Sequence, residues 1–285
     1  MITLTDNFAA LAAQYDVVLS DVWGVTHNGV AAFPEACAAL ERFRKRGGTV
    51  ILITNAPRRG EAVCRQLDRL GVPRSAYDGI VSSGDVTCTV MMQRPGQRVF
   101  HLGPERDLSI FEGLDARFAP AEQADYVVCT GLFNDDVETP EDYRERLAAM
   151  RARNLFMICG NPDVVVERGE RLIYCAGAIA DLYGSLGGEV VYAGKPYAPI
   201  YEMALAKAQT LRGRRAQRTR VLAIGDSIRT DVKGASAFGA DCLFVTAGIH
   251  AEELGSRDDP DLALLKKIFA EAGVEPKAVT RRLVW

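Results

Sequence analysis

The fold is decided by three consecutive segments, YDVVLSD (15–21), EACAALERFRKR (35–46) and TVILITN (49–55). The first and the third are short apolar runs, a pattern typical of strands buried on both faces of a parallel sheet. The middle segment carries apolar residues at helical spacing and ends before Gly47 and Gly48. Strand, helix and strand in this order predict a βαβ unit and hence an α/β protein.

The same alternation continues along the chain. GEAVCRQLDRL (60–70) is a predicted helix that ends before Gly71. The late part of the chain predicts further elements of the same sheet, namely strands at 189–194, 220–226 and 241–248 and helices at 198–211 and 232–239. The middle of the chain has its own predicted strands, at 98–103, 124–131 and 155–160.

This pattern predicts a doubly wound parallel-sheet core with a second α/β domain inserted into it. Residues 1–95 are expected to form the first part of the core and residues 189–285 the second part. Residues 96–188 are expected to form the inserted domain.

The composition is that of an ordinary globular protein, with 48% hydrophobic and 25% charged residues. A formal net charge of -3 gives no general attraction to nucleic acid or to an anionic membrane. The first twenty residues contain no Lys or Arg, and no apolar run reaches the ~18 residues of a membrane span. The seven cysteines form no CxxC pair, which is typical of buried free thiols in a reducing compartment. We expect a cytoplasmic protein without membrane contact.

Polar residues follow four of the apolar runs. They are Asp21 after VVLS, Thr54 and Asn55 after VILI, Lys195 after VVYAG, and Asp226 with Asp231 after VLAI. Ligands of an open parallel sheet bind beyond the carboxyl ends of its strands, so these groups are expected to converge. A carboxylate nucleophile, a hydroxyl, a lysine and a second carboxylate suit phosphoryl transfer with Mg²⁺.

Each position alone has a simpler interpretation. Asp21 and Thr54 are also typical turn or helix-capping residues, and most lysines are solvated. Asp231 either caps the helix that follows or orients Lys195. In the inserted domain, TGLFNDD (130–136) and GNPD (160–163) are either substrate-facing loops or ordinary turns.

Together, the motifs resemble those of the haloacid dehalogenase superfamily. DVWGV at 21–25, the Thr54–Asn55 step, GKP at 194–196 and GDSIRTDVKGA at 225–235 are similar to its four motifs, in the same order. The 141-residue gap from Thr54 to Lys195 leaves room for an inserted domain, and the 33-residue gap from Asp21 to Thr54 does not. An insertion at this place resembles class IIA, the NagD-like and 4-nitrophenylphosphatase-like branch. SSG at 82–84 and GNPD are similar to that branch as well.

The resemblance implies an enzyme, a Mg²⁺-dependent phosphoric monoester hydrolase that acts on a small phosphorylated metabolite through an aspartyl-phosphate. It implies that Asp21 attacks phosphorus and that Asp231 is a supporting acid. The residues implied are Asp21, Thr54, Lys195 and Asp231 for catalysis, Thr54, Asn55, Ala56, Lys195, Asn161 and Asp163 for substrate binding, and Asp21, the Trp23 carbonyl and Asp226 for the metal.

One position departs from the family pattern. Phosphatases of this family usually carry a second Asp two positions after the nucleophile, where this chain has Trp23. That Asp protonates the leaving group and activates water, and a positioned acid or base contributes ~10²- to 10⁴-fold to the rate. Three explanations are open: a substrate such as an aryl or acyl phosphate, whose leaving group needs little protonation; His27 as a substitute acid; or ligand binding with weak or no catalysis. Trp23 itself is either a packing residue or a wall that stacks on the substrate.

Two further functions are compatible with parts of this sequence. A dehalogenase also uses an Asp nucleophile, but it has no use for Asp226 in a magnesium site. The segment RGRRAQRTR (212–220) holds five arginines, which raises nucleic-acid binding as a function. It lacks aromatic residues and joins a predicted helix to a predicted strand of an acidic protein, which favours a solvated connection. We expect no nucleic-acid partner, and the sequence leaves a homodimer open.

Overall fold

The computed structural model describes residues 4–5, 7–168, 171–251, 253–255 and 259–285. The chain divides into two compact units. Unit 1 contains the chain up to Thr54, Glu61–Val81 and Lys195–Trp285, and unit 2 contains Asn55–Gly60 and Ser82–Gly194. Compared with the predicted insertion at 96–188, unit 2 begins earlier along the chain and ends later.

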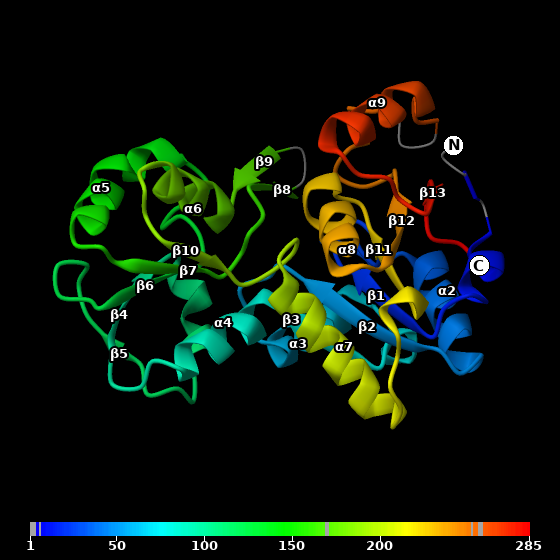
Figure 1. Ribbon diagram of the computed structural model, residues 1–285, viewed down its shortest axis with the longest axis horizontal. Helices are drawn as coiled ribbons and strands as arrows, with labels where there is room; N and C mark the ends of the chain where they lie inside the picture. The colour runs from blue at the N-terminus through cyan, green and yellow to red at the C-terminus, as the bar shows by residue number, and fades with distance from the viewer. Residues whose placement is uncertain (1–3, 6, 169–170, 252, 256–258) are drawn as a thin grey trace. The chain divides into compact units, whose positions relative to one another are not determined.

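Unit 1 is built on a six-stranded sheet with the strand order β13-β12-β11-β1-β2-β3 (Figure 1). β1 pairs in parallel with β2 and β11, and β12 pairs in parallel with β11 and β13. Every residue of β1, β2 and β11 is buried, as expected for strands covered on both faces. The elements of unit 1 are α1 (Phe8–Ala12), β1 (Val17–Asp21), α2 (Pro34–Lys45), β2 (Thr49–Thr54), α3 (Gly60–Leu70), β3 (Gly79–Ser82), α7 (Ala198–Arg212), β11 (Val221–Gly225), α8 (Lys233–Phe238), β12 (Asp241–Val245), α9 (Leu262–Ala272) and β13 (Ala278–Thr280).

The strand order of this sheet reverses between β1 and β11. From β1 the chain proceeds outward through β2 to β3, and it later returns to β11 on the other side of β1 before continuing to β12 and β13. Such a reversal is the topological switch point of a doubly wound sheet, where ligands bind beyond the carboxyl ends of the strands. The predicted fold class, a parallel-sheet α/β core, is confirmed.

Unit 2 has a sheet of its own, with the strand order β10-β7-β6-β4-β5. All of its strand pairs are parallel, and a separate antiparallel pair joins β8 to β9. Buried side chains from β6, β7, α5 and α6 form its core. The elements of unit 2 are α4 (Ser83–Met92), β4 (Arg98–Leu102), β5 (Arg117–Phe118), β6 (Tyr126–Cys129), α5 (Arg144–Ala152), β7 (Phe156–Cys159), β8 (Val165–Arg168), β9 (Arg171–Tyr174), α6 (Ala176–Ser185) and β10 (Val190–Tyr192).

The prediction that residues 189–194 form a strand of the first sheet is wrong. β10 pairs in parallel with β7, with Val190 opposite Met157 and Tyr192 opposite Cys159. A short apolar run has the same pattern in either sheet, and only its long-range partner decides where it belongs. Lys195 therefore follows an edge strand of unit 2 and precedes α7 of unit 1.

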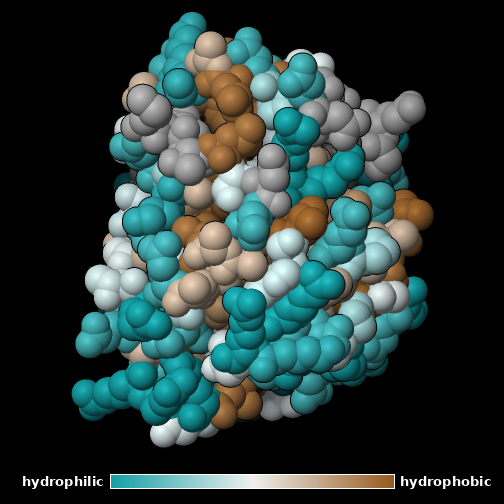
Figure 2. Space-filling view, turned by 90° about the vertical axis from the view of Figure 1, so that its right-hand side faces the viewer, coloured by the Kyte–Doolittle hydropathy of each residue, from teal (hydrophilic) through white to brown (hydrophobic). Residues whose placement is uncertain are grey.

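The face drawn in Figure 2 is mostly hydrophilic, with its hydrophobic residues in separate groups. Within the arginine-rich segment, Arg212 and Arg220 pair with Asp16, and Arg218 pairs with Glu202. Across the described ranges, no helix combines the length and the apolar character needed to cross a membrane. All seven cysteines are free and six are buried, in agreement with the sequence.

Candidate functional site

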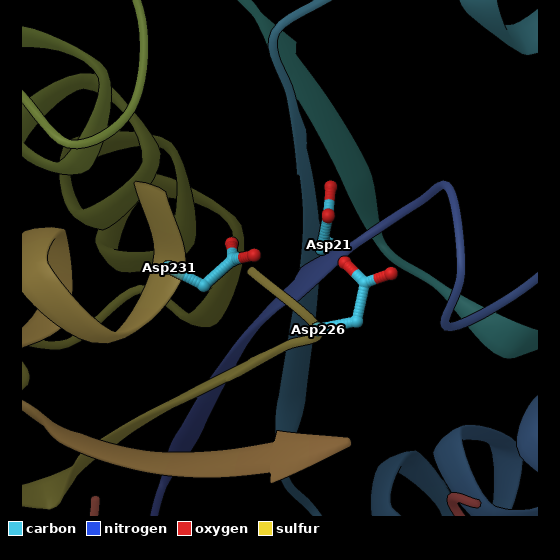
Figure 3. A group of neighbouring side chains, drawn as sticks. All are labelled: Asp21, Asp226 and Asp231. Carbon is cyan, nitrogen blue, oxygen red and sulfur yellow. The ribbon is translucent and has the colours of Figure 1, made fainter. Parts of the chain in front are cut away.

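Three carboxylates converge at the switch point of the unit 1 sheet (Figure 3). Asp21 is the last residue of β1, and Asp226 directly follows β11. Asp231 lies in the π-helical turn Ile228–Val232. One oxygen atom from each carboxylate lies within 4.8 Å of the others, and all three side chains are buried. Two carboxylates predicted as metal ligands and one predicted as a supporting acid thus share one site.

Lys195 lies between two of these carboxylates. Its Nζ is 2.7 Å from Asp21 Oδ1 and 2.7 Å from Asp231 Oδ1, and its side chain is only 2% exposed. A buried ammonium is costly unless it is paired in this way. Asp231 Oδ2 accepts a hydrogen bond from the Ser227 N–H at 3.1 Å. Asp231 therefore orients the lysine and also satisfies the amide at the start of its own turn. It does not cap the helix that follows, because α8 has Val232 at its cap position and no side-chain capping bond.

The electrostatics of the group favour a bound cation. Burial raises the pKa of Asp226 well above its usual range, and the charges of Asp21 and Asp231 raise it further. Burial also raises the pKa of Asp231 to about 6, with Lys195 opposing the shift. Three ionised carboxylates beside one ammonium leave two negative charges in excess, which a divalent cation would balance.

The donor set fits Mg²⁺. Carboxylate oxygens are ligands that Mg²⁺ prefers, usually one or two together with water. Both oxygens of Asp231 are engaged, by Lys195 and by the Ser227 N–H. Asp21 and Asp226 are therefore the pair that would hold the ion. The Trp23 carbonyl stays a predicted third ligand.

Thr54 lies at the end of the strand next to Asp21. It is the last residue of β2, and the register of β1 with β2 places Asp21 opposite Ile53. Thr54 is buried one residue further along. It thus comes at the same carboxyl edge of the sheet as Asp21, as the sequence predicts.

Three of the other predicted substrate-binding residues, Asn55, Asn161 and Asp163, are linked by hydrogen bonds within unit 2. Asn55 Nδ2 donates to Asp163 Oδ1 at 2.9 Å, and the Asp163 N–H donates to Asn161 Oδ1 at 3.1 Å. The Ala56 carbonyl accepts the Gly84 N–H at 3.2 Å. The GNPD turn is therefore joined to the residues that follow Thr54, and its role toward a substrate stays a prediction.

Trp23 and His27 pack together in the loop after Asp21. Their rings meet edge to face with centroids 5.2 Å apart, and Trp23 is 37% exposed. His27 is buried, its Nδ1 accepts the Gly29 N–H at 2.9 Å, and burial lowers its pKa to about 4. At pH 7 the imidazole is therefore neutral, which opposes its use as a substitute acid. Trp23 thus packs on His27 and keeps part of its ring at the surface, and its stacking on a substrate stays a prediction.

Sequence reasoning did not single out the segment after β12. The Ile249 N–H donates to Asp226 Oδ2 at 2.9 Å. The main signal in the sequence is a glycine, Gly248, directly after a buried apolar run. The Ile249 N–H is a backbone group that every residue except proline has, so the sequence carries no pattern that identifies its contact with Asp226, 23 residues away.

Comparison with known proteins gives two family matches. A family model described as haloacid dehalogenase-like hydrolase matches residues 18–117. A second, described as HAD-hydrolase-like, matches residues 192–269. These ranges include Asp21, Thr54, Lys195, Asp226 and Asp231 and leave out most of unit 2.

Similar proteins cover nearly the whole chain. The crystal structure of a haloacid dehalogenase-like hydrolase from Brucella suis is 48% identical, with a TM-score of 0.87, and the match covers 98% of this chain and 100% of that one. D-glycerol 3-phosphate phosphatase from Mycobacterium tuberculosis is 27% identical over 85% of this chain, and the match spans 66% of that protein, just under two thirds of its length. Ribonucleotide monophosphatase NagD from Escherichia coli is 26% identical over 82% of this chain and 88% of its own.

Proposed function

Since this chain belongs to the haloacid dehalogenase-like hydrolases, in the class IIA or NagD-like branch, we propose that it is a Mg²⁺-dependent phosphatase acting on a small phosphomonoester. The observation that carries the proposal is the Lys195 ammonium, 2.7 Å from both Asp21 and Asp231, beside Asp226. Two relatives are named as phosphatases of small phosphorylated metabolites, which supports the same substrate class.

In the proposed reaction, Asp21 is the nucleophile. Its carboxylate oxygen forms a bond to phosphorus while the bond from phosphorus to the ester oxygen breaks, and the leaving alcohol takes up a proton. Water then attacks phosphorus, which restores the Asp21 carboxylate and releases inorganic phosphate. Lys195 neutralises charge on the transferring group, and Asp231 holds the lysine in place. Thr54 would donate from the neighbouring strand end. A bound Mg²⁺ would supply further neutralisation of the phosphoryl oxygens.

The loop after Asp21 narrows the substrate class. Trp23 and a neutral His27 pack together in this loop, and neither residue supplies a charged acid at pH 7. A leaving group that is stable as an anion needs no such acid. We therefore propose that aryl and acyl phosphates are turned over faster than alkyl phosphates.

Trp23 and the neutral His27 also support a second candidate function, the binding of a phosphorylated ligand with weak catalysis. Both functions need the carboxylate and lysine cluster, and they differ in turnover. The dehalogenase alternative is less compatible with the site, because two carboxylates placed to share a divalent ion have no role in that reaction.

The proposal is tested with 4-nitrophenyl phosphate, in Mg²⁺ and in excess chelator. The wild type should require Mg²⁺, and Asp21→Asn should lose at least about a thousandfold in kcat, because the nucleophile is removed. Asp115→Asn, at an exposed acid of unit 2, is the matched control and should keep full activity. Equal turnover by Asp21→Asn and wild type would contradict the mechanism. Substrate binding without turnover by the wild type would favour the second candidate, and chloride release from a haloacid in chelator would favour a dehalogenase.

A further inference from the structure

The Asp226 carboxylate is held by a loop that has no part in the proposed reaction. This segment, residues 246–251, directly follows β12 and is called the clamp loop below. Its Ile249 N–H donates to Asp226 Oδ2 at 2.9 Å. One of the two oxygens of Asp226 thus has a fixed backbone donor.

Two glycines enclose the same oxygen. A Cβ on Gly248 would lie 1.9 Å from Asp226 Oδ2 and 2.3 Å from Asp226 Cβ. A Cβ on Gly24 would lie 2.0 Å from Asp226 Oδ2. These distances are far below van der Waals contact, so the carboxylate fits only because both positions lack a side chain. Gly24 also has a φ of +76°, whereas Gly248 is not among the glycines with a positive φ. A substitution at Gly24 would therefore strain the backbone as well as clash with Asp226, whereas a substitution at Gly248 would only clash with Asp226.

The clamp loop is anchored on both sides of Gly248. The Thr246 and Ala247 N–H groups donate to the carbonyls of Thr280 and Arg281 at 2.9 and 3.1 Å. The Ala251 N–H donates to the Gly248 carbonyl at 3.0 Å, and the Ala251 side chain is buried. The loop is therefore tied to the segment that continues β13.

His250 ties the clamp loop to the turn after Asp226. Its Nε2 accepts the Ile228 N–H at 3.3 Å, so Nε2 is unprotonated. Nδ1 therefore carries the proton and donates to Glu253 Oε2 at 2.9 Å. The imidazole thus joins the loop to the turn that also contains Asp231.

We propose that the clamp loop positions Asp226 for Mg²⁺, by engaging Oδ2 with the Ile249 N–H and directing Oδ1 toward the ion. Gly248, Ile249 and His250 are positioning residues, because each acts on the ion through Asp226 or its turn. A carboxylate that is already oriented loses less freedom when the ion binds, and groups that orient metal ligands typically contribute about 10- to 100-fold to metal affinity. The inference rests on the proposed function in that Mg²⁺ is the ion at this site.

The test is calorimetric titration of the full-length protein with Mg²⁺, without substrate. Gly248→Ala should weaken Mg²⁺ binding by about tenfold or more, because its methyl group displaces Oδ2. Gly184→Ala is the matched control, since a Cβ on Gly184 meets no atom within 4 Å, and it should bind as the wild type does. A folded Gly248→Ala protein that binds Mg²⁺ as tightly as the control would overturn the proposal.

A second pair of variants covers the case in which Gly248→Ala does not fold. His250→Ala removes the acceptor for the Ile228 N–H, and His250→Gln offers an amide oxygen in its place. The proposal predicts weaker Mg²⁺ binding by His250→Ala and recovery in His250→Gln, and equal affinity in all three proteins would overturn it. If the variants bind Mg²⁺ more weakly than the wild type but the wild type itself shows no turnover, the role of the clamp loop is upheld and the hydrolase function is contradicted. Absence of Mg²⁺ binding by the wild type would overturn both.

Discussion

His27 is a buried, neutral imidazole in the loop that follows the proposed nucleophile. Its folded-state pKa is about 4, against an ordinary value of 6.5, because burial disfavours the charged ring. Below pH 6.5 the unfolded chain gains a proton that the folded chain does not accept until about pH 4. His27 therefore favours the folded state above pH 6.5, and this contribution is lost as the pH falls from 6.5 to about 4.

We predict that the wild type loses up to about 3 kcal/mol more stability over this pH range than His27→Asn. The asparagine oxygen takes the place of Nδ1 as acceptor for the Gly29 N–H but does not titrate. The measurement is the free energy of unfolding of both proteins in urea, at about pH 7 and about pH 4. Identical pH dependence in the two proteins would show that His27 is not buried in its neutral form.

Trp23 is the residue that we expect to limit the range of substrates. In the Trp23→Asp variant a carboxyl group replaces the indole two positions after the proposed nucleophile. Hydrolysis of an alkyl phosphate should then accelerate by about a hundredfold, because a positioned acid is supplied, whereas 4-nitrophenyl phosphate should change little. Trp23→Phe is the control, since it keeps an aromatic ring over His27. Steady-state kinetics on both substrates test this, and the prediction fails if the aspartate and phenylalanine variants behave alike.

At the scale of single elements, the start of α4 shows how a short polar motif fixes a helix. Ser82 and Asp85 form a reciprocal pair in which Ser82 Oγ accepts the Asp85 N–H at 3.1 Å and the Ser82 N–H donates to Asp85 Oδ2 at 2.9 Å. Asp85 Oδ1 also accepts the Gly60 N–H at 3.1 Å. These bonds satisfy amides that the first turn of a helix otherwise leaves unpaired.

We predict that Ser82→Ala lowers the free energy of unfolding by about 1 kcal/mol, the usual cost of losing a helix-capping side chain. Thr89→Ala removes an exposed hydroxyl from the middle of the same helix and should change stability by less than about 0.5 kcal/mol. Urea unfolding of the three proteins makes the comparison. An equal effect of the two substitutions would mean that the capping pair does not stabilise α4.

The elements that the sequence predicts well are those with a local signal. The α3 helix begins and ends where its apolar spacing and Gly71 predict, and β1, β2 and β11 are the buried apolar runs. Sequence reasoning missed α4 and α6, because apolar and small residues surround these helices on several sides and leave no clear amphipathic period. It misplaced β10 because three apolar residues carry no information about which sheet they join.

The same distinction applies to the site. Asp21 and Asp226 could be predicted because strand ends at a switch point converge by topology alone. The contact of Ile249 with Asp226 could not, because it depends on the exact path of a loop, and the sequence left the pairing of Asp231 with Lys195 as one of two interpretations. The sequence therefore identifies the reacting groups better than the groups that hold them.

At the scale of the whole molecule, the chain forms two compact units. Unit 1 contains the carboxylates and the lysine, on a sheet whose two halves come from opposite ends of the chain. Unit 2 is an α/β unit with its own parallel sheet and core, formed by Asn55–Gly60 and Ser82–Gly194. The first passage from unit 1 to unit 2 directly follows Thr54, and the last passage back directly precedes Lys195. Both residues are proposed to bind the transferring phosphoryl group.

The central claim is that Asp21 carries the phosphoryl group during turnover, and it concerns the intact protein. The most direct measurement is acid quenching of the full-length enzyme during turnover of 4-nitrophenyl phosphate with Mg²⁺, followed by peptide mass spectrometry. We predict that the peptide containing Asp21 gains the mass of one phosphoryl group, that hydroxylamine removes it, and that Asp21→Asn never acquires it. Sustained turnover with the phosphoryl group on another residue, or on none, would contradict the account.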